Sequence, residues 1–295
     1  MVGLKLESTK LIGSGSWSEV WIADTSAGRV VVRFLRPKNG TMPRMVFETA
    51  LRRKLHQDGI RVAKPVATSR DFPQRVHQKP WIIDDYLAGD TYPRGEIPKR
   101  ACVDLANVLS HLHNIEGLGF GLPHDSAEFK GTEDTIQYGL TTRFDNPWPF
   151  GVLSLDEHPI SEVGNKPVLD RLNNLRPELE SEAQDSLSRV VHTDLHEGHI
   201  ICIGEQLSGL IDFGDAMIGD PAWDFASLYY FHGERVLNTV LGAYESNGIS
   251  ASTLRYRATL FSACIACHHA MRSKRLNKPH RMSAALAHLE QSLEH

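Results

Sequence analysis

HTDLHEGHI, residues 192–200, places three histidines and two acidic residues within nine positions. The apolar pairs Val190-Val191 and Ile200-Ile201 flank its polar part. Short apolar runs that end in polar residues are typical of buried strands, so the segment predicts a loop held between two short strands. Such a density of titratable groups in one loop indicates a chemical task.

Length and composition limit the classes to which the protein can belong. The chain has 295 residues, with 41% hydrophobic and 23% charged residues, which are ordinary values for a globular protein. This length predicts one large domain or two smaller ones. The formal net charge of −4 disfavours a nucleic-acid partner, because such a partner requires a concentrated basic surface. We therefore expect no nucleic acid.

Targeting signals are the next consideration. The first residues, MVGLKLESTK, become charged at once, and no stretch elsewhere is long enough to cross a bilayer. We therefore expect a cytoplasmic protein without a membrane partner, whose four cysteines are reduced thiols. Residues 293–295, LEH, resemble the start of a purification-tag linker and carry no functional weight.

The predicted elements change character near Gly89. Before it, β-branched runs at residues 11–23, 29–34 and 80–89 surround one helical segment over about 43–56. After it, a helical pattern begins at Pro98, and most of the last sixty or so residues are helical. A Pro-punctuated, acid-rich region lies between, at about 124–186. We predict a small β-rich lobe over residues 1–89 and a larger, mainly helical lobe over 90–292.

GSGSWSEV, residues 13–20, is a glycine-rich segment between two strand-like runs. Its small residues would let backbone N–H groups approach phosphate oxygens, although a plain hairpin turn is the alternative. The order of the chain favours phosphate, because Arg33 follows in the strand VVVRF and Glu48 on the next helix, as in a phosphate-holding ion pair. Taken singly, Arg33 could equally be a residue of an edge strand, and Glu48 could equally lie on a solvated helix face.

Three residues in the C-terminal half have the side chains that in-line phosphoryl transfer needs. That reaction needs a carboxylate that accepts a hydroxyl proton and ligands for a metal ion. Asp194 precedes His199 by five residues, and Asp212 follows the apolar pair Leu210-Ile211, where a strand end would aim it into a cleft. The order predicts Asp194 as proton acceptor, with His199 and Asp212 as metal ligands.

These motifs resemble those of the aminoglycoside phosphotransferases and related antibiotic and small-metabolite kinases. HTDLHEGHI is similar to the family's HGDLHxxN, and IDFGDAMIGDPAWDFA, residues 211–226, to its IDFxxxxxGDPxxDLA. The resemblance implies an α+β, bilobal protein-kinase-like fold with nucleotide bound by residues 1–89 and catalytic and substrate residues in 90–292. It implies a transferase that uses Mg²⁺ and moves the γ-phosphoryl group of ATP or GTP to a substrate hydroxyl.

The same resemblance implies a role for each motif residue. Asp194 resembles the catalytic aspartate and Asp212 the main magnesium ligand. Supporting residues that would brace the catalytic loop are His192, Asp215, Asp220 and Asp224. The nucleotide-binding residues implied are Gly13, Ser14, Gly15, Ser16, Ser18, Val20, Arg33, Glu48, Asp85 and Leu87, the last two in the link between the lobes.

Two residues depart from the commonest family pattern. His199 stands where most members have asparagine, and a neutral imidazole is a poorer partner than an oxygen for magnesium. The same substitution occurs in the macrolide kinases and the 2″-aminoglycoside kinases. Arg33 stands where protein kinases have lysine, and its planar guanidinium can still bind phosphate oxygens in pairs.

The identity of the acceptor stays open at this level. Between Asp125 and Asp185, acidic residues outnumber basic ones by thirteen to five, which suits a cationic substrate. The tail instead carries seven nearly unopposed bases, Arg255, Arg257, Arg272, Lys274, Arg275, Lys278 and Arg281. We expect an antibiotic, an aminoglycoside or a macrolide. A metabolite kinase of the choline, sugar or homoserine type and a catalytically silent nucleotide-binding regulator are the alternatives. ATP versus GTP and the oligomeric state are also open.

Two further patterns have structural and functional interpretations. CIACH, residues 264–268, has the spacing of c-type haem attachment, but its apolar, helix-compatible surroundings favour a structural role. FDNPWPF, residues 144–150, fits either an aromatic substrate platform or a packed loop, and we favour the packed loop.

Overall fold

The protein is described by a computed structural model that covers residues 5–15, 17–37, 43–72, 79–246 and 248–292. Ser16 and residues 293–295, for which the sequence analysis made predictions, lie outside these ranges.

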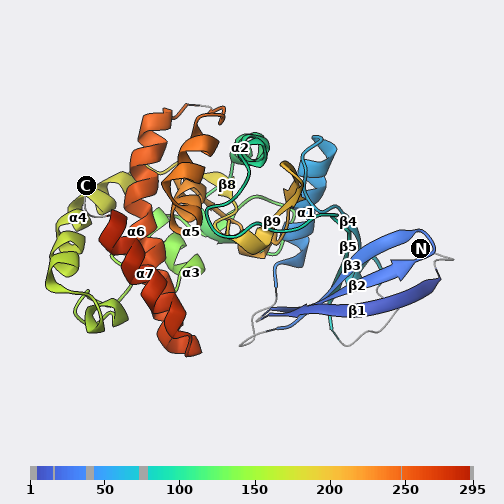
Figure 1. The fold of residues 1–295 in the computed structure, drawn as a ribbon, viewed down its shortest axis with the longest axis horizontal. Helices are drawn as coiled ribbons and strands as arrows, with labels where there is room; N and C mark the ends of the chain where they lie inside the picture. Colours follow the sequence, from blue (N-terminus) through green and yellow to red (C-terminus); the bar gives the residue numbers. More distant parts are fainter. Residues whose placement is uncertain (1–4, 16, 38–42, 73–78, 247, 293–295) are drawn as a thin grey trace.

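A twisted sheet forms the blue end of the molecule, on the right of Figure 1. Its strands are antiparallel in the order β1-β2-β3-β5-β4. Helix α1 lies between the sheet and the rest of the molecule. These elements confirm the strand runs and the helix predicted for the first ninety residues. Their bounds are β1 Leu6–Ser14, β2 Ser18–Thr25, β3 Gly28–Leu35, α1 Met45–Gln57, β4 Pro65–Thr68 and β5 Trp81–Asp85.

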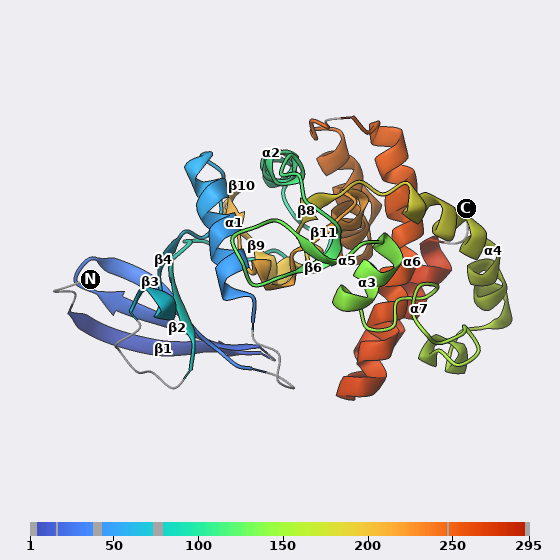
Figure 2. The same cartoon turned by 180° about the vertical axis from the view of Figure 1, so that it is seen from behind.

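Helices dominate the other end, where α5, α6 and α7 pack against one another (Figures 1 and 2). The α+β architecture with a β-rich N-terminal part and a helical C-terminal part is therefore confirmed. The helices are α2 Lys99–His113, α3 Ile136–Arg143, α4 Lys166–Gln184, α5 Ala222–Leu241, α6 Ala251–Leu276 and α7 Pro279–Ser292.

Short strands lie between the two ends and carry the motif loops. A hairpin joins β9 and β10, and a second small sheet has the order β7-β6-β11-β8. HTDLHEGHI connects β8 to β9, which confirms the predicted loop between two short strands. The strands are β6 Phe120–Pro123, β7 Gly131–Glu133, β8 Arg189–Val191, β9 Ile200–Ile203, β10 Gln206–Leu210 and β11 Met217–Gly219.

Helix α4 lies in the region that the sequence analysis treated only as Pro-punctuated and acid-rich. Its side chains Val168, Leu172, Leu179 and Ala183 are buried on one face. Asn165 caps the N-terminus by accepting the Val168 N–H at 3.1 Å, and Pro167 fits the first turn, where no partner for its nitrogen is needed. Pro177 lies inside the helix, and this proline concealed the helical spacing.

The two ambiguous patterns prove to be parts of the core. Cys264 and Cys267 are fully buried thiols in α6, as the structural interpretation of CIACH predicts. Trp148 of FDNPWPF is also buried, as expected of a packed loop. Phe144, the first residue of that segment, packs against Trp223 with ring centroids 5.2 Å apart.

Among the helices of the described ranges, none combines the length and apolar character that a bilayer crossing requires.

The chain after β5 is attached to strand β9 through Gly89 and Asp90. Asp90 and Cys202 exchange two backbone hydrogen bonds, each 2.9 Å long. Gly89 has φ of +128°, and a Cβ atom there would lie 2.3 Å from the Cys202 carbonyl oxygen. Close backbone approach therefore requires glycine at this position.

We predict that Gly89→Ala destabilises the protein more than Gly28→Ala does. Gly28 has a similar φ of +118° but nothing near its would-be Cβ atom, so its substitution costs only backbone strain, roughly 1–3 kcal/mol. At Gly89 the collision with Cys202 adds to that cost. Urea unfolding of both variants measures the difference, and equal losses would contradict the role of the close approach.

Candidate active site

The loop between β8 and β9 is fixed from beneath by helix α5. The Asp224 carboxylate is fully buried and accepts the N–H groups of His192 at 2.9 Å and Thr193 at 2.6 Å. It also accepts from His113 Nε2 at 2.9 Å, while Ser227, one turn further on, accepts the Leu195 N–H. Charge-assisted hydrogen bonds of this kind hold Thr193 at φ of +64°, a conformation that a threonine rarely adopts.

His192 links this loop to the segment that carries Asp212. Its Nε2 donates to the Ile211 carbonyl oxygen at 3.0 Å, and its Nδ1 accepts the Asp194 N–H at 3.3 Å. Burial lowers the pKa of His192, which keeps the ring neutral and both hydrogen bonds intact. The two motif aspartates are therefore tied to one imidazole ring.

Asp194 stands at the outer end of the loop with its side chain 25% exposed. Burial acts to raise the pKa of its carboxyl, but the neighbouring His199, Arg143 and His196 outweigh burial and lower the pKa to about 2. The carboxylate is therefore ionised at neutral pH. Charged Asp194 can accept a hydrogen bond from a substrate hydroxyl group that faces it across the cleft.

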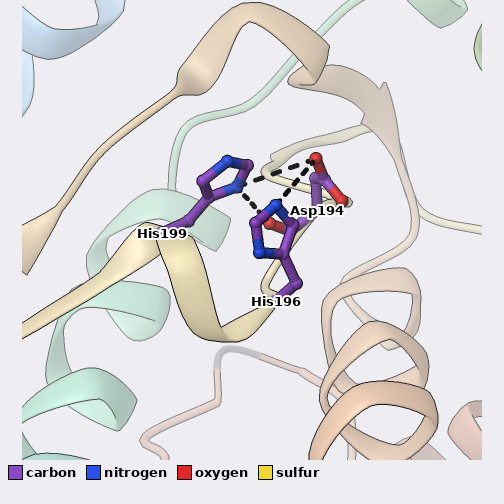
Figure 3. Close-up of side chains that lie close together, drawn as sticks. All are labelled: Asp194, His196 and His199. Carbon is purple, nitrogen blue, oxygen red and sulfur yellow. Dashed lines mark hydrogen bonds and ion pairs between the residues drawn. The ribbon is translucent and has the colours of Figure 1, made fainter. Parts of the chain in front are cut away.

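Figure 3 shows Asp194 facing two histidines, His196 and His199, whose rings lie 3.7 Å apart between centroids. His199 Nδ1 lies 2.7 Å from the Asp194 carbonyl oxygen, which can only accept, so Nδ1 carries the proton. His196 Nδ1 accepts the Gly198 N–H at 2.9 Å, so in the neutral ring Nε2 carries the proton and faces Asp194 at 3.9 Å. These three side chains lie close enough to suggest a metal site. However, both ring nitrogens that face the carboxylate carry hydrogen and cannot be ligands.

Asp212 lies on the far side of His199. In the neutral ring His199 Nε2 carries the lone pair, and it lies 3.4 Å from Asp212 Oδ2. Asp212 has φ of +61°, and its side chain is 55% exposed toward the cleft. Burial acts to raise its pKa, but His199 and Arg33 outweigh burial, and the pKa is lowered. One imidazole nitrogen and one carboxylate thus converge, and the second ring nitrogen is oriented by a backbone carbonyl, as is usual for metal-binding histidines.

Arg33 of β3 belongs to a buried network of two cations and two anions. Its guanidinium bonds Glu48 at 2.6 Å and Asp84 at 3.0 Å. Arg52 bonds the same two carboxylates, at 3.4 Å and 2.7 Å. Burial alone would lower the pKa of Arg33, but Glu48 and Asp84 raise it. Glu48 is thus a buried ion-pair partner, and the solvated-face interpretation of it is wrong.

Three adjoining cavities lie along these residues, and Asp212 lines all of them. The first, of about 480 Å³, lies between apolar side chains of the sheet, such as Val20 and Ile22, and Ile201 and Ile211. The second, of about 150 Å³, lies beneath the glycine-rich hairpin. The third, of about 720 Å³, extends past Asp194 to helices α6 and α7.

Residues 8–258 match the sequence profile of the phosphotransferase enzyme family, APH. The chain belongs to this family. The catalytic-loop pattern and the IDF segment both lie within the matched range. No curated protein matches the chain.

Solved structures share the fold of this phosphotransferase at low sequence identity. Aminoglycoside phosphotransferase APH(4)-Ia has a TM-score of 0.69 and 14% identity, over 98% of this chain and 94% of that one. Macrolide 2′-phosphotransferase MphH from Brachybacterium faecium has a TM-score of 0.60 and 17% identity, over 97% and 94%. The GDP and kanamycin complex of APH(2″)-IIia has a TM-score of 0.61 and 18% identity, over 98% and 93%. A further APH(4)-Ia structure is a ternary complex with AMP-PNP and hygromycin B, with a TM-score of 0.65 and 13% identity.

Most predicted site residues of the phosphotransferase lie at these cavities. Gly13, Val20, Asp85 and Leu87 line the apolar cavity, Gly15 and Glu48 line the small one, and Ser18 and Arg33 line both. Ser14 lines none of the three, and its hydroxyl accepts from Arg36 at 3.2 Å. Asp215 lines the small and the large cavity and pairs with Arg143 at 3.3 Å.

Asp220 lies behind the site, fully buried beneath the start of α5. It accepts the N–H groups of Ala222 at 2.8 Å and Leu187 at 3.1 Å, and it pairs with Arg257 at 2.9 Å. These contacts fit the bracing position that the resemblance implies for it.

Sequence reasoning missed several residues of the site. Asp84 was overlooked, although alternation in β5 places it on the same side as buried Ile82. Arg143 was also overlooked; its Nε donates to Thr193 Oγ1 at 2.7 Å, beside Asp194. Arg44 was missed too, and it donates to the Gly214 carbonyl oxygen at 2.7 Å while lining the small cavity.

We predict that Asp84→Asn lowers the free energy of unfolding by about 3–5 kcal/mol, because two buried guanidinium groups lose a charged partner. Asp85→Asn is the matched control, since the neighbouring carboxylate is exposed and its loss should leave stability nearly unchanged. Urea unfolding measures both variants. Equal stabilities of the two would show that the network contributes little.

Proposed function

We propose that this phosphotransferase moves the γ-phosphoryl group of a nucleoside triphosphate, ATP or GTP, to a hydroxyl group of a small molecule. The observation that carries the proposal is the convergence of Asp194, His199 and Asp212 where the three cavities meet. The bound nucleotides named for the fold neighbours support the same donor class.

The apolar cavity has the shape and lining for the nucleotide base. Aliphatic side chains lie on both of its sides, and the backbone of residues 85–87 runs along its edge. Backbone N–H and C=O groups of this link would bind the polar edge of a purine. The small cavity beneath the glycine-rich hairpin would take phosphate oxygens, near Arg33 and Arg44.

Asp212 and His199 fit a magnesium ion, the metal that the family implies. Asp212 would hold the ion through its carboxylate and His199 through Nε2, the nitrogen that does not face the Asp194 carbonyl oxygen. Bound there, magnesium would neutralise charge on the phosphates of the nucleotide. This combination of a nitrogen and an oxygen ligand tolerates manganese as well.

Asp194 is proposed as the proton acceptor. The acceptor hydroxyl would lie in the large cavity next to the carboxylate, its oxygen would bond to the γ-phosphorus, and the bond from that phosphorus to the bridging oxygen would break. The nucleoside diphosphate leaves, and the hydroxyl proton passes to Asp194. Arg143 holds Thr193 and Asp215 and so keeps the loop oriented. Positioning and charge neutralisation supply most of the rate.

Two alternatives concern the acceptor and the activity. An antibiotic acceptor, aminoglycoside or macrolide, would raise the drug tolerance of a susceptible host that expresses the protein, and a metabolite acceptor would leave it unchanged. Arg272 and Arg281, which line the large cavity without an ion-pair partner among the described residues, favour an anionic metabolite over a cationic drug. A catalytically silent regulator would bind nucleotide without transfer, but the ionised Asp194 and the approach of His199 Nε2 to Asp212 favour an active enzyme.

We predict that Asp194→Asn lowers turnover by at least ~10²-fold, because the amide cannot accept the hydroxyl proton. Nucleotide affinity should stay close to that of the unaltered protein, since Asp194 lines the large cavity and neither of the two nucleotide cavities. Product formation by mass spectrometry and nucleotide binding by calorimetry measure the two effects. Undiminished turnover would remove Asp194 from the chemistry.

A further inference from the structure

The wall of the large cavity opposite the nucleotide side is built from one face of α6 and the start of α7. Ile265, His268, His269 and Arg272 follow one another at helical spacing, so all four face the cavity. Arg281, in the first turns of α7, completes this wall. We call these five residues the acceptor wall.

The charges around the cavity do not balance at the acceptor wall. Arg94 binds Glu197 at 3.1 Å and Arg143 lies 3.3 Å from Asp215, while the carboxylates of Asp194 and Asp212 face the cavity from the loop side, where the reacting group and the metal would lie. By contrast, neither Arg272 nor Arg281 forms an ion pair with any residue of the described ranges. The Nε atom of each is buried without a hydrogen-bond partner among those residues. Because Nε is out of reach of a ligand, the donors for the cavity are the terminal nitrogens, of which Arg281 uses Nη1 to bind His269.

The neighbouring histidines do not offset these charges. Burial, and then repulsion by Arg281, lower the pKa of His269 to about 3, so its neutral ring accepts through Nδ1 from Arg281 at 2.9 Å. Burial also lowers the pKa of His268 well below its usual range, and its Nδ1 accepts the Asp145 N–H. Burial, then repulsion by Arg281 and Arg143, lowers the pKa of Arg272 itself. Unpaired cations held together in a partly buried wall are costly unless an anion binds there.

The acidic region at 124–186 does not supply that anion. None of its thirteen acidic side chains, all within the described ranges, lines any of the three cavities. Glu162 and Asp145 instead bind Lys274 and Arg275. The acid-rich region therefore gives no support for a cationic substrate in the cleft. An ammonium group at the acceptor wall would face two unpaired guanidinium groups.

We propose that the acceptor is a hydroxylated small molecule with an oxyanion, a carboxylate or a phosphate, which Arg272 and Arg281 bind while its hydroxyl group faces Asp194. This inference rests on the proposed phosphotransfer. Guanidinium groups bind both oxyanions through paired N–H donors. Asp194 and Asp215 are among the charges that act on Arg272, so the wall and the loop face one cavity.

The test uses compounds that share a skeleton and differ in charge. We would incubate the full-length protein with magnesium, ATP or GTP, and each member of two sets: glucose 6-phosphate, glucose and glucosamine, and glycerate with glyceramide. Kanamycin and hygromycin B are added as cationic acceptors. The anionic members should be phosphorylated with kcat/KM roughly tenfold or more above their neutral partners. The two sets distinguish a phosphate from a carboxylate. Preferred transfer to a neutral or cationic compound would overturn the proposal.

Variants of the wall supply the second readout. Arg272→Gln and Arg281→Gln should each raise KM for the anionic acceptor about tenfold or more, with little change in the KM of the nucleotide. Arg275→Gln is the matched control, because this arginine lies on the same helix, binds Asp145 and lines none of the cavities. Unchanged KM for the acceptor in both wall variants would overturn the proposal.

If no compound is phosphorylated, direct binding of oxyanions to the protein tests the proposed site. With the nucleotide site filled by MgADP, inorganic phosphate and glycerate should bind the unaltered protein and lose affinity in Arg272→Gln and Arg281→Gln. No binding, or equal binding by the variants, would overturn the oxyanion site. The proposed function fails separately, if nucleotide binds without metal dependence and is never consumed.

Discussion

The buried carboxylate of Asp224 is the interaction on which the catalytic loop depends. It accepts two successive backbone N–H groups of the loop and a histidine of α2, so three parts of the chain meet at one fully buried charge. Burial acts to raise its pKa, but His113 and His192 outweigh burial, and the pKa is lowered. Because Thr193 is held in a left-handed conformation, Asp194 emerges on the cleft side of the loop rather than in the core.

The charged side chains around this loop form two groups: those that pair with one another inside the protein and those that face the cleft. Glu48 and Asp84 pair with two arginines inside the protein. Asp212 instead lies next to His199, and both line the cleft. Arg272 and Arg281 line the large cavity without an ion-pair partner among the described residues, and we assign them to the oxyanion of the acceptor. A phosphoryl group between Asp194 and Asp212 would thus have a proton acceptor on one side and charge neutralisation on the other. This arrangement explains why so many titratable groups occupy one short loop.

Local spacing allowed the prediction of Asp194, Asp212 and the strands around them, because a loop between two short strands keeps its residues together in any fold. Long-range contacts were not predictable in the same way. Asp84 meets Arg33 from 51 positions away, and although alternation in β5 indicates that Asp84 is buried, only the packing of β3 against β5 shows which cation it meets. The tail showed its basic residues plainly, but only the placement of α6 and α7 shows that Arg272 and Arg281 reach the cleft. The division of the chain near Gly89 stays a prediction.

In the proposed mechanism, His199 and the phosphates of the nucleotide bind the same metal ion, and the most direct test is to locate that ion relative to His199. Manganese, as a paramagnetic substitute for magnesium, would be bound with a non-hydrolysable nucleoside triphosphate to protein that contains ¹⁵N-labelled histidine, and pulsed electron paramagnetic resonance would record the coupled nuclei. We predict coupling to both histidine ¹⁵N and phosphate ³¹P in one complex. The nitrogen coupling should disappear in His199→Asn and persist in His196→Gln. Phosphorus coupling without any histidine coupling, or a nitrogen signal that survives His199→Asn, would contradict this arrangement.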